Sequence, residues 1–274
     1  MRINLFDTII REYPDAKLLS EGGQKSVFKI AHPLYGESVI KIGDYEQDTE
    51  LERIRREVEV LRSIKSEYFP KIYEFEENQK EKKFKIIEEY VQSVPLSEKM
   101  SMFETSDKTF SFLLDMVTGL NVLWQKKIVH RDIKPENILI TDVDTIKIID
   151  LGIARVLDAE SLTATACLIG PCTAIYASPE QIQNHKLDID WRSDQFSLGI
   201  VAGQLLCGGQ HPFSPNLVSG NSIVSNIITG NWFKDCLETV DKNSRHIITK
   251  MLGNKRHQRF RTPEILMREL RESF

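Results

Sequence analysis

The side chains best suited to chemistry lie in one short segment, the eight residues from His130 to Asn137. Asp132 precedes Asn137 by five positions, and Asp150 follows Asn137 by thirteen, at the end of an apolar run and before Gly152. Asn137 and Asp150 together offer the hard oxygen ligands that Mg²⁺ prefers, with phosphate oxygens and water completing the coordination. Asp132 then remains to accept a proton from an attacking hydroxyl group. A single aspartate would more often cap a turn, but chance explains the ordered set poorly.

The first part of the chain, which must position some of these groups, reads mostly as β-strand. Short apolar runs predict strands within residues 17–31, 38–42, 71–76 and 84–90. Residues 50–65 break this pattern, because Leu51, Ile54, Val58 and Leu61 recur at helical spacing. One helix among several strands is therefore expected before Pro95.

The second part of the chain reads as mostly helical. Residues 110–124 are rich in apolar side chains over more than three turns, and residues 195–207 are apolar on nearly every side, which is typical of a buried helix. Between them, residues 137–140 and 146–150 predict a short strand pair. We expect a strand-rich lobe over residues 1–91 and a helical lobe over residues 92–274, an α+β architecture.

Composition narrows the classes of protein that remain. Apolar residues make up 41% and charged residues 28% of the 274-residue chain, which excludes a disordered or fibrous protein. No apolar run approaches the ~18 residues of a membrane span, and no secretory signal begins the chain, so a cytoplasmic location is expected. The net charge is −4 and neither lobe is basic, which disfavours nucleic-acid binding. The four cysteines show no zinc-binding spacing, and reduced thiols are expected.

The motifs resemble those of the eukaryotic-like (Hanks-type) protein kinases, and the bacterial members most closely. His130 to Asn137 looks like the catalytic loop, and Asp150-Leu151-Gly152 stands for the Asp-Phe-Gly of the family. Residues 177–180, Ala-Ser-Pro-Glu, are similar to the Ala-Pro-Glu element, and residues 192–199 resemble the start of the central buried helix. Arg259 is similar to the late arginine that pairs with Glu180. The resemblance implies a two-lobed protein kinase fold with ATP in the cleft.

The resemblance also implies a reaction and a role for each residue. The γ-phosphoryl group of ATP would pass to a Ser or Thr hydroxyl of a protein substrate, with Asp132 orienting and deprotonating that hydroxyl. Lys134 would neutralise the γ-phosphate, while Asn137 and Asp150 bind Mg²⁺. Lys41 would hold the α and β phosphates.

Glu57 is the expected partner of Lys41. It lies within the apolar stripe of the predicted helix, where a carboxylate is costly unless it meets a cation.

The nucleotide-binding segments depart from the family pattern in two places. In the phosphate loop, Ser20 and Lys25 replace two glycines, whereas Gly22 and Val27 are kept. In the predicted hinge, the backbone groups of Glu89 and Val91 would receive the adenine. Glu88 then falls at the gatekeeper position behind the nucleotide, where apolar residues or Thr are usual. Either Glu88 pairs with Lys41 or the register is off by one residue.

Residues 153–176 match the segment that shapes the groove for a protein substrate in the family. Lys134 and Thr173 together favour Ser/Thr specificity, and Arg131 would receive a phosphate added by autophosphorylation at Ser161, Thr163 or Thr165. A pseudokinase scaffold is the main alternative, since the phosphate loop and Glu88 are atypical. A small-molecule kinase is a second alternative, which the Ala-Ser-Pro-Glu element opposes. The substrate, the activating signal and any regulatory partner are left open.

Overall fold

The computed structural model of the protein describes residues 9–21, 25–151, 155–156, 174–218, 220, 222–238 and 240–273. The side chains of Arg53, Arg155, Val156 and Cys236 lie outside this description. Contacts within the chain define two compact units, Met1–Gln92 and Ser93–Phe274, which we call the N-unit and the C-unit. The sequence predicts this boundary between residues 91 and 92.

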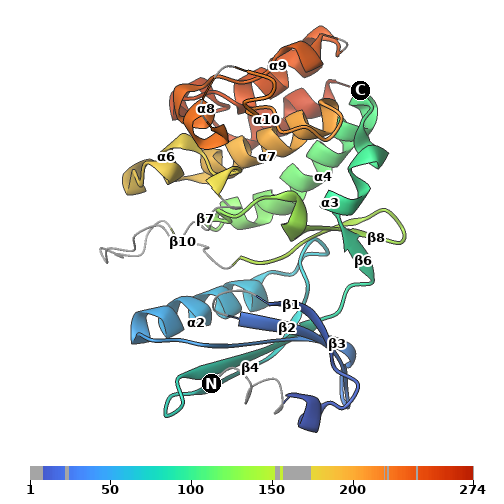
Figure 1. Ribbon diagram of the computed structural model, residues 1–274, viewed down its shortest axis with the longest axis vertical. Helices are drawn as coiled ribbons and strands as arrows, with labels where there is room; N and C mark the ends of the chain where they lie inside the picture. Colours follow the sequence, from blue (N-terminus) through green and yellow to red (C-terminus); the bar gives the residue numbers. More distant parts are fainter. Residues whose placement is uncertain are drawn as a thin grey trace. The chain divides into compact units, whose positions relative to one another are not determined.

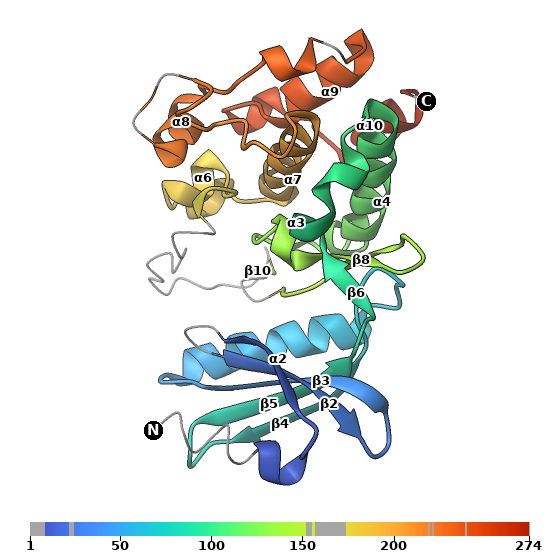
Figure 2. The same cartoon turned by 45° about the vertical axis from the view of Figure 1, so that its right-hand side comes forward.

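The N-unit contains a five-stranded sheet with the order β1-β2-β3-β5-β4, and all its neighbouring strands are antiparallel (Figure 1). A single long helix, α2, lies along one face of this sheet in both views (Figures 1 and 2). The elements are β1 (Lys17–Glu21), β2 (Lys25–His32), β3 (Gly36–Asp44), α2 (Asp48–Ser63), β4 (Ile72–Asn78) and β5 (Lys83–Glu89). The predicted strands and helix of this unit are confirmed.

Successive side chains of each strand point to opposite faces of the sheet, and both faces carry apolar side chains. In β3, Ile40 and Ile42 point to the face that Ile9 and Tyr13 cover from the N-terminal segment. On the opposite face, Phe84 and Ile86 of β5 form a second cluster with Leu51 and Val58 of α2. Lys41 falls between Ile40 and Ile42 in sequence, so its side chain points to the α2 face.

The C-unit is built around α7 (Trp191–Leu206), which packs against α4 (Ser106–Trp124) and α9 (Lys242–Met251). Every residue of α7 from Ser193 to Leu205 is buried, as the sequence predicts for a helix with no polar face. Gly199 permits the close packing on α9, since a Cβ atom there would lie 3.0 Å from the Cβ of Met251.

The remaining elements of the C-unit surround this core (Figure 2). They are β6 (Ser93–Pro95), α3 (Leu96–Lys99), η1 (Met100–Phe103), β7 (Ile128–Val129), η2 (Pro135–Asn137), β8 (Ile138–Thr141), β9 (Ile146–Ile148), β10 (Arg155–Val156), α6 (Pro179–Ile182), η3 (Lys186–Asp188), α8 (Ile223–Thr229), η4 (Asp235–Leu237), η5 (Arg256–Gln258) and α10 (Pro263–Arg271). The predicted strand pair is confirmed, because β8 and β9 are antiparallel neighbours.

The structure bears on two further expectations, the reduced state of the cysteines and the lack of a membrane span. The expectation of reduced thiols is wrong for Cys207, which is disulfide-bonded. The chemical reason is that a thiol's state depends on which cysteine the fold brings near it, and spacing along the chain does not report that. Within the described ranges, no helix has the length and apolar character needed to span a bilayer.

His211 gives the C-unit a predictable response to acid. Its Nδ1 accepts from the backbone N–H of Phe213 at 3.2 Å, and its Nε2 lies 2.9 Å from the carbonyl oxygen of Ile175. Both contacts suit a neutral ring with the proton on Nε2. Burial lowers the pKa of His211 to about 4, and the hydrogen bond to Ile175 opposes this only in part.

We expect the free energy of unfolding to decrease as the pH falls from about 6.5 to about 4. In that window the unfolded chain binds a proton at His211 and the folded chain does not, so acid favours unfolding by up to roughly 3 kcal/mol. Urea unfolding between pH 7 and pH 4.5 measures this effect. His211→Gln should make the decrease shallower, whereas His257→Gln, at an exposed position, should not. Identical pH dependence in all three proteins would contradict the assignment.

Candidate active site

The segment from His130 to Asn137 is anchored by a buried carboxylate of α7. Asp194 is fully buried and accepts three hydrogen bonds, from the backbone N–H groups of His130 at 2.9 Å and Arg131 at 2.8 Å and from Trp124 Nε1 at 2.9 Å. Such a carboxylate holds a loop because an unsatisfied buried N–H is costly. This role of Asp194 is not predicted from the sequence. The available signal is an aspartate in the first turn of a helix that is otherwise buried over most of its length.

Strained backbone geometry occurs both in this loop and in the separate segment that contains Asp150. Arg131 has a φ of 70° and Asp150 a φ of 60°, in the left-handed region that residues other than glycine rarely occupy. Strain of this kind persists only where the surrounding contacts enforce it, and it gathers at functional sites. The contacts of Asp194 with Arg131 provide such enforcement on one side of Asp132.

Asp132, Lys134 and Asn137 come together as the sequence predicts. Lys134 Nζ lies 3.0 Å from Asp132 Oδ2, and Asn137 Nδ2 donates to the same oxygen at 2.8 Å. The amide of Asn137 also donates to the backbone carbonyl of Asp132 at 2.9 Å. The other carboxylate oxygen, Oδ1, is buried with no hydrogen-bond partner among the described residues. One oxygen of Asp132 is thus held by two side chains, whereas the other has no partner among the described residues.

Asp150 is held beside this group through the residue that precedes it. The backbone N–H of Ile149 donates to the carbonyl of Asn137 at 3.0 Å, and the carbonyl of Ile149 lies 3.2 Å from His130 Nε2. His130 Nδ1 accepts from the N–H of Asp132 at 3.3 Å, so the proton of a neutral ring belongs on Nε2. Burial lowers the pKa of His130, in agreement with a neutral ring, although nearby carboxylates oppose the shift. His130 therefore links the Asp132 and Asp150 segments.

The donor atoms in this region fit a hard divalent cation. Both donor contacts of Asn137 Nδ2 face Asp132, which leaves the Asn137 Oδ1 carbonyl on the other side of the amide as a ligand. Asp150 follows Ile149, whose backbone N–H donates to the carbonyl of Asn137, and its carboxylate is the second candidate ligand. Mg²⁺ prefers one or two such ligands together with phosphate oxygens and water. In the described ranges there is no cluster of three or more His, Cys, Asp or Glu side chains suited to a metal. Mg²⁺ tolerates so sparse a protein ligand set when a nucleotide supplies the remaining oxygens.

The Ala-Ser-Pro-Glu element is fastened to the C-unit core by a buried ion pair. Arg259 Nη1 lies 2.7 Å from Glu180 Oε1, and Arg259 Nη2 donates to Glu180 Oε2 at 2.9 Å. Although burial acts to raise it, the pKa of Glu180 is lowered overall by its hydrogen bonds with Arg259 and Ser193. The predicted pairing of Arg259 with Glu180 is confirmed. The neighbouring Gln181 donates through Nε2 to the carbonyl of Arg131 at 2.9 Å, which connects the element to the catalytic loop.

In the N-unit, Lys41 of β3 pairs with the carboxylate of Glu88 of β5. Lys41 Nζ lies 2.7 Å from Glu88 Oε1, and both side chains are buried. Of the two readings of Glu88 left open by the sequence, the structure thus supports the ion pair. Glu57 is half-buried on α2.

The other predicted nucleotide-binding residues of the N-unit are Val27, Glu89 and Val91. Val27 is buried in β2, while Glu89 and Val91 are half-buried at the end of β5 and just beyond it. Gly22, Ser161, Thr163, Thr165 and Thr173 lie outside the described residues.

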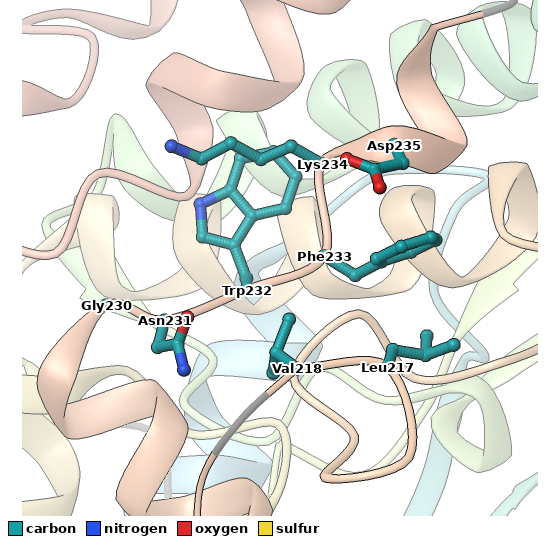
Figure 3. Close-up of a pocket in the computed structure, with 8 residues that line it drawn as sticks. All are labelled: Leu217, Val218, Gly230, Asn231, Trp232, Phe233, Lys234 and Asp235. Carbon is teal, nitrogen blue, oxygen red and sulfur yellow. The ribbon is translucent and has the colours of Figure 1, made fainter.

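A pocket of about 340 Å³ lies elsewhere in the C-unit (Figure 3). Its walls come from the segment after α8 and from residues 217 and 218, and Lys234 extends over the ring of Trp232 in the close-up. None of its lining residues belongs to the catalytic loop or to the Asp150 segment. The pocket therefore does not coincide with the candidate active site.

Comparison with known proteins identifies the class to which this fold and site belong. Residues 13–270 match the protein kinase domain family. Because the match covers nearly the whole chain, the protein belongs to that family, in agreement with the α+β architecture of a strand-rich and a helical unit. The resemblance to Hanks-type kinases of bacterial origin is thereby confirmed.

Several bacterial serine/threonine-protein kinases are similar to this chain. PknA of Mycobacterium tuberculosis is 31% identical over 218 residues, which cover 76% of this chain and 49% of PknA. The probable kinase pknA2 of Bifidobacterium longum is 31% identical over 210 residues, 72% of this chain and 26% of that protein. PknB of Mycobacterium tuberculosis is 38% identical over 133 residues, 47% of this chain and 20% of PknB. The chain thus spans half or less of the length of these relatives.

Proposed function

We propose that this protein is a serine/threonine-protein kinase that transfers the γ-phosphoryl group of ATP to Ser or Thr hydroxyls of proteins. The arrangement of Asp132 carries the proposal. Its Oδ2 is held by Lys134 and Asn137, while its Oδ1 has no partner among the described residues and is available to a substrate hydroxyl. The similarity to proteins named serine/threonine-protein kinases supports the same function.

In this proposal the protein contributes mainly positioning and charge. Asp132 Oδ1 accepts the hydrogen bond of the substrate hydroxyl, orients its oxygen toward the phosphorus atom, and takes its proton as the new bond forms. Lys134 places a positive charge where the γ-phosphoryl group carries its negative charge. Because the transition state of phosphoryl transfer is loose, orientation and neutralisation supply most of the rate enhancement.

We assign nucleotide binding in the N-unit to the residues predicted from the sequence. Lys41 binds the α and β phosphates, and Glu57, Gly22 and Val27 support that site. The backbone groups of Glu89 and Val91 receive the adenine.

Asn137 and Asp150 hold Mg²⁺, which when bound neutralises the phosphate oxygens. The supporting observation is that the backbone of Ile149, the residue before Asp150, contacts the carbonyl of Asn137 and the ring of His130.

Autophosphorylation at Ser161, Thr163 or Thr165 remains a prediction, as does control by a regulatory partner. We place the reaction in the cytoplasm, where ATP is abundant.

The test is incubation of the protein with γ-labelled ATP, Mg²⁺ and a generic protein substrate. We expect label on Ser and Thr residues of the substrate, and we expect a chelator of divalent cations to abolish the transfer. Binding of ATP without any transfer would instead identify a pseudokinase scaffold. Transfer of label to a small molecule and never to protein would identify a small-molecule kinase.

A further inference from the structure

The charge environment of Lys41 is unusual for its position inside a sheet. Lys41 lies in the middle of β3, and its side chain is only 9% exposed. Its neighbours in sequence, Ile40 and Ile42, belong to the apolar cluster on the other face. An ammonium group at such a site is retained in its charged form only if an anion lies beside it.

Glu88 supplies that anion from the adjacent strand. Its side chain is 7% exposed, and its Oε1 lies 2.7 Å from Lys41 Nζ. In the antiparallel ladder Val39 is opposite Glu88 and Lys41 is opposite Ile86, so the pair joins diagonal neighbours on one face. Diagonal neighbours lie within reach of long side chains such as these.

The backbone of the sheet fixes the position of this pair. Strands β3 and β5 remain in register from Ser38 and Glu89 to Asp44 and Lys83 without a bulge. Ile86, between Glu88 and Phe84 on the same face, belongs to the apolar cluster beneath α2. This apolar surrounding lowers the local dielectric constant and strengthens the attraction. Glu57, in contrast, lies on α2, which packs on the sheet through apolar side chains.

We infer that Glu88 is a positioning residue for phosphoryl transfer, which holds the Lys41 ammonium from within the sheet and directs it to the nucleotide phosphates. An ammonium group has three N–H donors, so one can remain on Glu88 while the others meet phosphate oxygens. The family resemblance gives this task to the helix glutamate, Glu57. The inference adds a carboxylate whose position does not depend on the placement of α2. It rests on the proposed function.

The kinetic test compares Glu88→Gln, Glu88→Asp and Glu57→Gln. Glu88→Gln keeps the size of the side chain and removes its charge, so Lys41 loses its orientation, and displacement by about 1 Å can cost on the order of 10²-fold in rate. We expect kcat to fall 10- to 100-fold while KM for ATP stays within about threefold, because removing an anion does not weaken the attraction of Lys41 for phosphate. Glu88→Asp should have a higher kcat than Glu88→Gln. The decrease in kcat in Glu57→Gln should be smaller than that in Glu88→Gln.

The matched control is Glu76→Gln. Glu76 pairs with Lys85 at 2.9 Å across β4 and β5 of the same sheet, but its side chain is 59% exposed. We expect its kinetic constants to equal those of the wild type. A wild-type kcat in Glu88→Gln, or a larger loss in Glu57→Gln than in Glu88→Gln, would overturn the inference. If the wild type transfers no phosphate, it is the proposed function that has failed.

A stability cycle tests the pair without relying on activity. Lys41→Met and Glu88→Met each leave one buried charge without this partner, whereas the double variant leaves neither. We expect both single variants to lower the urea midpoint. The double variant should lose much less stability than the sum of the two single losses. Strictly additive losses would show that Glu88 does not hold Lys41, even where Glu88→Gln is too unstable for kinetics.

Discussion

Replacing Asp132 by asparagine is expected to remove most of the phosphoryl transfer and to leave the fold and nucleotide binding intact. Asparagine has nearly the same shape and still accepts hydrogen bonds from Lys134 and Asn137 through its carbonyl oxygen. It lacks the basic oxygen that takes the proton of the substrate hydroxyl, and a positioned base contributes about 10²- to 10⁴-fold. We therefore expect kcat to fall by that factor.

The measurement is transfer of label from ATP to a protein substrate, with nucleotide affinity determined in parallel by calorimetry. Asp142→Asn is the control, since Asp142 is exposed in the turn that joins β8 and β9. It carries the same chemical change within the same unit and should behave as the wild type. Turnover near the wild-type value in Asp132→Asn would remove Asp132 from the mechanism.

Replacing Arg259 by methionine is expected to destabilise the C-unit strongly. Arg259 is 1% exposed, and besides Glu180 it donates to the backbone carbonyls of Gly253 at 2.7 Å and Arg192 at 3.0 Å. Methionine fills much of the volume but leaves the Glu180 carboxylate buried without its cation. Breaking a buried ion pair in this way costs about 3–5 kcal/mol.

Urea or thermal unfolding measures the loss, and each kcal/mol should lower Tm by roughly 2–4 °C in a chain of this size. Arg268→Met is the matched control, because Arg268 lies on α10 with 62% of its side chain exposed, and its ion pairs with described residues, Glu269 and Glu272, are at the surface. We expect it to change stability by less than about 1 kcal/mol. A similarly small change in Arg259→Met would mean that the Glu180 pair does not stabilise the fold.

The sequence determined the features that depend on local periodicity and on the order of motifs. The spacing of Leu51, Ile54, Val58 and Leu61 predicts a helix because a helix buries one stripe every 3.6 residues, and α2 covers residues 48–63. The order of Asp132, Lys134 and Asn137 predicts one catalytic group because the three residues are too close in sequence to lie far apart. Arg259 and Glu180, although distant in sequence, were matched through the family motifs.

Tertiary structure alone decided the partners that no local pattern reports. The anchoring role of Asp194 depends on α7 packing beside a loop more than 60 residues earlier in the chain. The disulfide at Cys207 likewise depends on proximity in space. The sequence leaves the pairing of Lys41 with Glu88 as one of two alternatives. The register of β3 against β5 decides between them, since a shift of one residue would turn Glu88 to the opposite face. Periodicity shows which face of an element is buried, but only the packed chain shows which charges meet there.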